Sequence, residues 1–69
     1  MNKLDEARSQ AEAILALRDE DLSRMFFRET MRRNLSRIVT RLDRLVRNGG
    51  EDRTLGERAL KRLGFAPEE

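Results

Sequence analysis

The chain has 69 residues, enough for one small domain, and its 15 basic and 13 acidic residues leave a net charge of only +2. It contains no histidine, cysteine, tryptophan or tyrosine, so the commonest catalytic acids, bases and nucleophiles are absent, and so are disulfides. We therefore predict a protein that is not an enzyme, with no catalytic residues, no metal site and no cofactor. The polar N-terminus lacks the apolar segment of a signal peptide, and no apolar run reaches the roughly 18 residues of a membrane span, which predicts a cytoplasmic protein.

The supply of core-forming side chains is small. Nineteen large apolar residues follow Met1, and no disulfide is present to support them. A scaffold of this size gains little net stability when burial is weighed against ordering entropy, unless it oligomerises or docks on a partner. We therefore predict that the chain associates, preferably as a homodimer.

A first helix is predicted over residues 3–18. Asn2 is a suitable N-cap, and Asp5 and Glu6 fall in the first turn, where the positive end of the helix dipole favours acidic side chains. The apolar residues that recur at helical spacing are Leu4, Ala7, Ala11 and Ile14.

The sequence RDEDLS, from residue 18 onward, predicts a break. Its three acidic residues are unfavourable at the end of a helix and favourable at the start of the next one. We therefore expect a second helix over residues 20–47. A continuous bent helix is the alternative, because no glycine or proline marks a turn here.

Residues 31–46 form the clearest amphipathic segment of the chain. Their apolar members step by three and four positions, which places them on one side of an α-helix. The heptad lasts for little more than two repeats, which favours a helix-bundle face over a long coiled coil. The residues expected in the core or in a self-association surface are Phe27, Met31, Leu35, Ile38, Val39, Leu42, Leu45 and Val46.

Glycines delimit a short third helix, predicted over residues 55–63. Gly49 and Gly50 end the second helix and form a flexible link. Thr54 and Glu57 then match a capping box, in which the two side chains satisfy free backbone donors. Gly64 stands where a left-handed cap residue belongs, and we expect residues 66–69 to be a frayed tail.

Positive charge is concentrated in residues 22–48, where eight arginines and two carboxylates leave a net charge of +6. Such a cluster is typical of a site for an acidic partner. The alternative is a solvated helix face, in which arginine stems cover apolar surface and arginines pair locally, as in Glu29–Arg33 and Asp43–Arg47. The candidate partner-binding residues are Arg24, Arg28, Arg33, Arg37, Arg44, Arg47 and Phe26.

Two adjacent phenylalanines, Phe26 and Phe27, point about 100° apart on a helix. We expect Phe27 to join the apolar stripe of residues 31–46 and Phe26 to lie on a second side. As core residues the two side chains bridge two packing surfaces. The functional alternative is an interface anchor, because Arg24 and Arg28 flank the pair.

These features together predict an all-α fold, a small helical bundle of two main helices and a short third helix, completed by dimerisation. The predicted function is that of a small non-enzymatic adaptor or regulatory protein whose basic helix binds a larger protein with an acidic surface. A nucleic-acid-binding regulator is the first alternative, although a net charge of +2 is low for it. A purely structural self-assembly module is the next, and a membrane surface is the least favoured partner.

Overall fold

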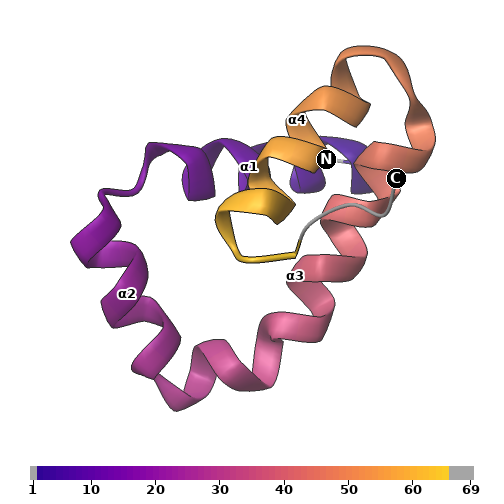
Figure 1. The fold of residues 1–69 in the computed structure, drawn as a ribbon. Helices are drawn as coiled ribbons and strands as arrows, with labels where there is room; N and C mark the ends of the chain where they lie inside the picture. Colours follow the sequence, from indigo (N-terminus) through magenta and orange to yellow (C-terminus); the bar gives the residue numbers. More distant parts are fainter. Residues whose placement is uncertain (1, 66–69) are drawn as a thin grey trace.

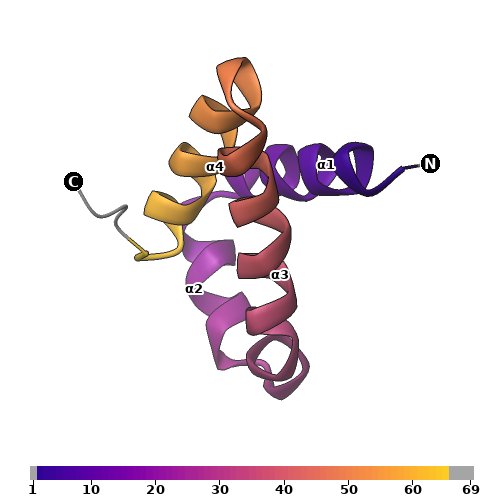
Figure 2. The ribbon, with the colours of Figure 1, turned by 90° about the vertical axis from the view of Figure 1, so that its right-hand side faces the viewer.

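The computed structural model describes residues 2–65, which form four helices: α1 (Lys3–Ala16), α2 (Asp19–Phe27), α3 (Glu29–Asn48) and α4 (Gly50–Arg62) (Figure 1). No strand occurs in this part of the chain, so the predicted all-α class is confirmed. In Figure 1, α1, α2 and α3 follow three sides of a triangle, and α4 packs against α1 and α3. In Figure 1, α2 and α3 diverge from the point where they join, and Figure 2 shows α1 projecting away from both. No helix within residues 2–65 combines the length and the hydropathy that crossing a membrane requires.

The start of α1 and the break after it follow the sequence pattern. The Asn2 side chain accepts a hydrogen bond from the backbone N–H of Asp5 at 2.8 Å, as expected of an N-cap. The helix ends at Ala16, two residues earlier than predicted, and the chain is extended at Leu17. The three acidic residues then occupy the first turn of α2. The alternative of one continuous helix through this region is therefore wrong.

The single helix predicted over residues 20–47 is also wrong, because the chain is extended at Arg28, with φ −80° and ψ 128°. At 100° per residue, a straight helix would point Leu22 and Leu42 to opposite sides. Both side chains belong to the same core. The break at Arg28 turns α3 relative to α2, so that the two apolar faces meet.

The core lies mainly among α1, α3 and α4, which contact one another pairwise and are here called the three-helix body. Ile14, Leu42 and Leu45 are its largest fully buried side chains. Alanines on α1 bring this helix close to its neighbours, as small residues allow. By contrast, α2 contacts mainly α3. The buried residues are Ala7, Ala11, Ile14, Leu22, Met31, Ile38, Leu42, Leu45, Ala59, Leu60 and Leu63.

The apolar stripe of residues 31–46 packs within one chain. Four of its predicted members are buried, and three more are half-buried against them. Phe27 differs, since 78% of its surface is exposed. The break at Arg28 removes Phe27 from the helical frame that aligned it with the stripe. The buried members are Met31, Ile38, Leu42 and Leu45, and the half-buried members are Leu35, Val39 and Val46.

The connection from α3 to α4 is shorter than predicted. Gly49, at φ +80°, is the one residue between the two helices, and Gly50, at φ +60°, already begins α4. Both angles lie in the left-handed region, which glycine adopts without steric cost. The predicted capping box is therefore wrong: Thr54 lies inside α4, and Glu57 instead accepts a hydrogen bond from Arg53 Nε at 2.9 Å.

Gly56 sets the close approach of α4 to α3. A Cβ atom at this position would lie 2.7 Å from the backbone oxygen of Leu42 and 3.0 Å from side-chain atoms of Leu45 and Val46. Such distances are shorter than van der Waals contact. The two helices therefore pack backbone to backbone here, and only glycine fits without a shift.

The end of α4 has the predicted glycine cap, and it also contacts the start of α2. Gly64 has φ +94°, and the Phe65 N–H donates to the Leu60 carbonyl at 2.9 Å, as in a Schellman cap. Arg62 reaches back to the start of α2: its Nη2 donates to the Leu17 carbonyl and, at 3.1 Å, to Asp19 Oδ1. The tail predicted for residues 66–69 lies outside the described residues.

Candidate cationic binding surface

The arginines of α3 differ in their partners, and one of them, Arg32, donates from Nε to the Phe26 carbonyl at 3.2 Å. Arg33 pairs with Glu29 at 3.0 Å, and Arg47 pairs with Asp43 at 2.9 Å, as the spacing of four residues predicts. Both arginine side chains are well exposed, at 76% and 81%. Exposed pairs of this kind contribute little to stability. They do, however, neutralise two of the cations that the sequence assigned to partner binding.

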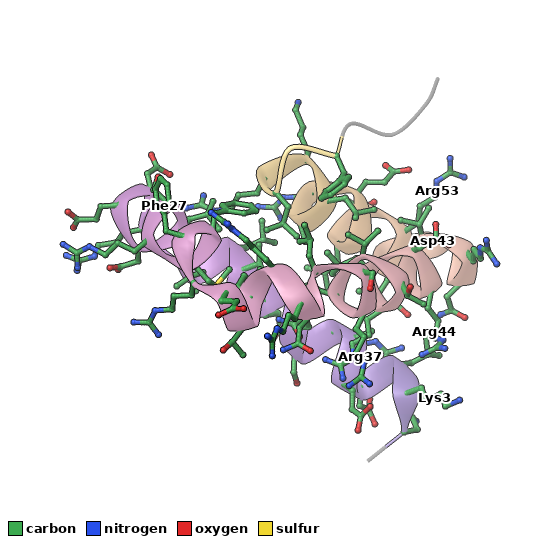
Figure 3. The ribbon with its side chains drawn as sticks, turned by 90° about the horizontal axis from the view of Figure 1, so that it is seen from below. Lys3, Phe27, Arg37, Asp43, Arg44 and Arg53 are labelled. Atoms are coloured by element: carbon green, nitrogen blue, oxygen red, sulfur yellow. The ribbon has the colours of Figure 1, made fainter. Side chains whose placement is uncertain are left out.

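Other basic side chains keep their charge unpaired. Nine basic side chains have no carboxylate within ion-pair distance among the described residues, and five of them, here called the cationic strip, line two neighbouring grooves. One comes from α1, one from the α2–α3 junction and three from α3. Figure 3 shows three of them, Lys3, Arg37 and Arg44, on the same side of the molecule. The strip consists of Lys3, Arg28, Arg37, Arg41 and Arg44.

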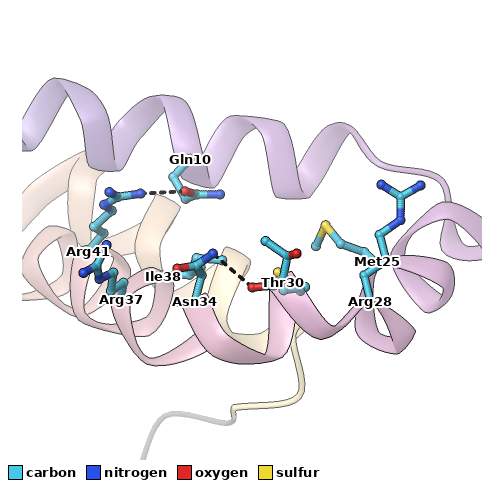
Figure 4. A pocket seen from close by; sticks show the side chains of 9 residues that line it. Gln10, Met25, Arg28, Thr30, Asn34, Arg37, Ile38 and Arg41 are labelled. Carbon is cyan, nitrogen blue, oxygen red and sulfur yellow. Dashed lines mark hydrogen bonds between the residues drawn. The ribbon is translucent and has the colours of Figure 1, made fainter.

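Helix periodicity and helix packing together place the side chains of the cationic strip close to one another. Arg37, Arg41 and Arg44 stand at positions i, i+4 and i+7 of α3, so they share one face of the helix. The packing of α1 against α3 then adds Lys3 at its edge. Arg41 Nη1 donates to Gln10 Oε1 at 3.1 Å, which holds the Arg41 side chain between the two helices (Figure 4).

A pocket opens at the end of the strip nearest to α2, and we call it the methionine pocket (Figure 4). Its volume is about 450 Å³. Its wall on α2 is Met25, and its apolar floor comes from Met31 and Ile38 of α3. The cations on its rim are Arg28, Arg37 and Arg41, and its remaining polar residues are Gln10, Thr30 and Asn34.

A shallower and more polar groove continues from the methionine pocket along α3. The two share Arg37 and Arg41, and the groove extends past Thr40 to Lys3 and Arg44. No acidic residue lines either of them. The strip is therefore a continuous run of positive charge that leads into an apolar recess.

The other candidates lie apart from this groove or differ from their predicted burial. Phe26 is half-buried and packs against the core, whereas Phe27 is exposed, so the burial of the two is the reverse of the prediction. Figure 3 shows Phe27 at the end of the molecule opposite to Lys3. Arg24 is exposed on α2 and lines a small depression with Arg28.

An ion pair between distant segments positions α1. Arg8 donates through Nε and Nη2 to the two carboxylate oxygens of Asp52, both at 2.8 Å. Asn48 Nδ2 donates to the same carboxylate at 2.7 Å. The hydrogen bonds from Arg8 and Asn48, together with the Arg8 charge, lower the pKa of Asp52. The pair fixes α1 to the first turn of α4, and thereby keeps Lys3 and Gln10 beside α3.

Sequence reasoning missed Lys3, Arg41 and the pair of Arg8 with Asp52. Arg41 carried a usable signal, since it follows Arg37 by four residues on the predicted helix. Lys3 carried none, because its place depends on how α1 docks. Arg8 and Asp52 are 44 residues apart, and no local pattern connects them.

The structure offers no metal centre among residues 2–65, since no three histidine, cysteine, aspartate or glutamate side chains come together there. Comparisons with known proteins add no relative. No family model, no curated protein and no solved structure matches the chain.

Proposed function

We propose that this protein is a non-enzymatic adaptor or regulator that binds an acidic segment of a larger protein through the cationic strip. The observation that supports the proposal is the unpaired state of the strip. Five cations surround grooves that no carboxylate lines, although the chain carries 13 acidic residues. A cytoplasmic location, as predicted from the sequence, is part of this proposal.

The physical reason is electrostatic. Like charges that gather without counter-charges repel one another, and an acidic partner relieves that repulsion. Such a surface also steers a partner of opposite charge and raises its association rate. Arg41 and Arg44 are only half-exposed, and Arg41 is held by Gln10, so part of the ordering cost of binding is met before the partner arrives.

The test compares two variants of equal net charge. The strip variant replaces three unpaired arginines with glutamine: Arg37, Arg41 and Arg44. The control variant replaces three arginines that already pair with carboxylates: Arg33, Arg47 and Arg53. Glutamine preserves helix propensity, so both variants should keep the wild-type circular dichroism spectrum.

Binding to poly-L-glutamate is the quantitative readout, and capture of acidic proteins from a lysate is the qualitative one. We expect the strip variant to bind polyglutamate about tenfold or more weakly than wild type, and the control variant to stay within about twofold. Equal losses in the two variants would show that only net charge matters, and would contradict the proposal.

Nucleic acid is the second candidate, because Arg37, Arg41 and Arg44 form a row that phosphates would also fit. Against it stand the low net charge and the absence of an aromatic side chain from both grooves, since proteins that hold single strands stack bases on aromatic rings. Binding to duplex DNA whose log-affinity falls with log salt by about 0.9 per phosphate contact would favour this candidate. We expect no measurable binding to random duplex at moderate salt.

Homodimerisation is also part of the proposal, but its surface must differ from the one first expected. The three-helix body covers the stripe of residues 31–46 within one chain. Phe27 is the most exposed large apolar side chain of the described residues and is the candidate dimer contact. Sedimentation equilibrium should show a dimer for wild type and a monomer for Phe27→Ser. A monomer in both samples would contradict the proposed homodimer.

A further inference from the structure

We infer that the methionine pocket receives one large apolar side chain of the acidic partner segment, while the arginines on its rim bind carboxylates on either side of it. The inference rests on the proposed function and specifies the chemistry of the partner. That partner is a peptide segment with an apolar anchor between acidic residues, rather than a uniformly acidic chain.

The floor and wall of the pocket suit an apolar occupant. Met31 and Ile38 are almost fully buried, at 8% and 7% exposure, so they form a fixed base. Met25 is half-buried on the neighbouring helix α2. Methionine is flexible and polarisable, and it adapts to the shape of an inserted side chain. The volume of about 450 Å³ lies within the range of roughly 300–1,000 Å³ that small occupants fill.

The rim determines the charge of the occupant. Arg28 approaches the pocket from the α2–α3 junction, and Arg37 and Arg41 approach it from α3 (Figure 4). An apolar side chain between these guanidinium groups would bring its neighbours along the chain to the arginines. Carboxylates at those neighbouring positions would form charge-assisted hydrogen bonds with the guanidinium groups.

A peptide fits these features better than a nucleic acid does. A base inserted into a pocket is usually stacked on an aromatic ring or hydrogen-bonded along its edge. The lining of the methionine pocket holds no aromatic side chain, and its floor offers thioether and aliphatic groups instead. Apolar anchors in such pockets supply a large share of binding energy at protein interfaces.

The composition of the chain provides a sensitive test. Because the chain has no tryptophan and no tyrosine, a tryptophan in a probe peptide is the only strong fluorophore in the mixture. The first probe carries one tryptophan between two runs of glutamate. The second probe has serine in place of that tryptophan and is measured by competition. We expect the tryptophan emission to shift to the blue on binding, and the serine peptide to compete about tenfold more weakly.

Three variants locate the anchor. Met25→Ser removes the wall of the pocket, and Thr30→Phe fills part of its space. Val39→Ser is the matched control, because Val39 is also half-buried but lines a different groove, which shares no residue with the methionine pocket. With folding checked by circular dichroism, the first two variants should lose most of the blue shift, whereas the control should keep it.

The failure of this inference is distinguishable from the failure of the proposed function. If both peptides bind equally and the emission does not shift, the cationic strip binds acidic segments but the pocket receives no anchor. The same conclusion follows if Val39→Ser loses the shift as fully as Met25→Ser does. If neither peptide binds while duplex DNA does, the proposed function is overturned together with the inference.

Discussion

The three-helix body and α2 differ in how they are held. The body contains every fully buried large side chain of the described residues, and a two-bonded ion pair joins α1 to α4. Helix α2 contributes one buried residue, Leu22, and contacts mainly α3. Segments with few buried contacts open at lower free energy than the core does. Stability therefore resides in the body, while α2, which carries the wall of the methionine pocket, is the part that adapts most easily.

Removing a core side chain should lower the free energy of unfolding more in the three-helix body than in α2. Leu45→Ala, in the body, should lower the free energy of unfolding by about 3–5 kcal/mol, because the residue is fully buried among close neighbours. Leu22→Ala, in α2, should cost about 2 kcal/mol, since its surroundings can collapse more freely. Urea unfolding followed by circular dichroism measures both. Equal losses of unfolding free energy in the two variants would mean that α2 is packed as firmly as the three-helix body.

A smaller loss is expected where α3 and α4 touch. Gly56→Ala forces a Cβ atom against the Leu42 backbone oxygen and should destabilise the protein by about 1–3 kcal/mol, despite the better helix propensity of alanine. Thr54→Ala, two residues away and exposed, is the control and should change stability by less than about 0.5 kcal/mol. A loss for Thr54→Ala as large as that for Gly56→Ala would show that the close contact at Gly56 is not the cause of the destabilisation.

The smallest expected effect concerns pH and the attachment of α1 to α4. The pKa of Asp52 is lower in the folded protein than in the unfolded chain, so its contribution is complete above about pH 4 and is lost as the pH falls through the folded value. Asp52→Asn should therefore lower the melting temperature at neutral pH, and this difference from wild type should shrink at about pH 3. Asp43→Asn, which removes only an exposed pair, should change the melting temperature little at either pH.

Local features of the fold could be predicted from the sequence, and features that depend on packing could not. The Asn2 cap, the break before Asp19 and the turn at Gly64 each depend on a few neighbouring residues, and all three predictions are confirmed. The break at Arg28 carries no glycine or proline and follows from the need to turn two apolar faces into one core. The connection to α4 uses the positive φ of Gly49 and Gly50, whereas the contact of Gly56 with α3 depends on packing that no local pattern shows.

The same distinction applies to the candidate surface. The spacing of arginines along residues 31–46 predicted a basic face and its two local pairs, and the pairs are confirmed. The arginine spacing could not predict which of these arginines belong to the cationic strip. Lys3 and Gln10 come close to Arg41 and its neighbours only when α1 packs against α3.

The contact of Arg62 with the Leu17 carbonyl and Asp19 has a consequence for synthesis on the ribosome. This contact and the pair of Arg8 with Asp52 each join segments more than 40 residues apart. Because α1 packs against both α3 and α4, its apolar side is fully covered only when both helices have left the exit tunnel. A nascent chain arrested before α4 should therefore leave part of this side exposed and be cleaved by proteases faster than the full chain.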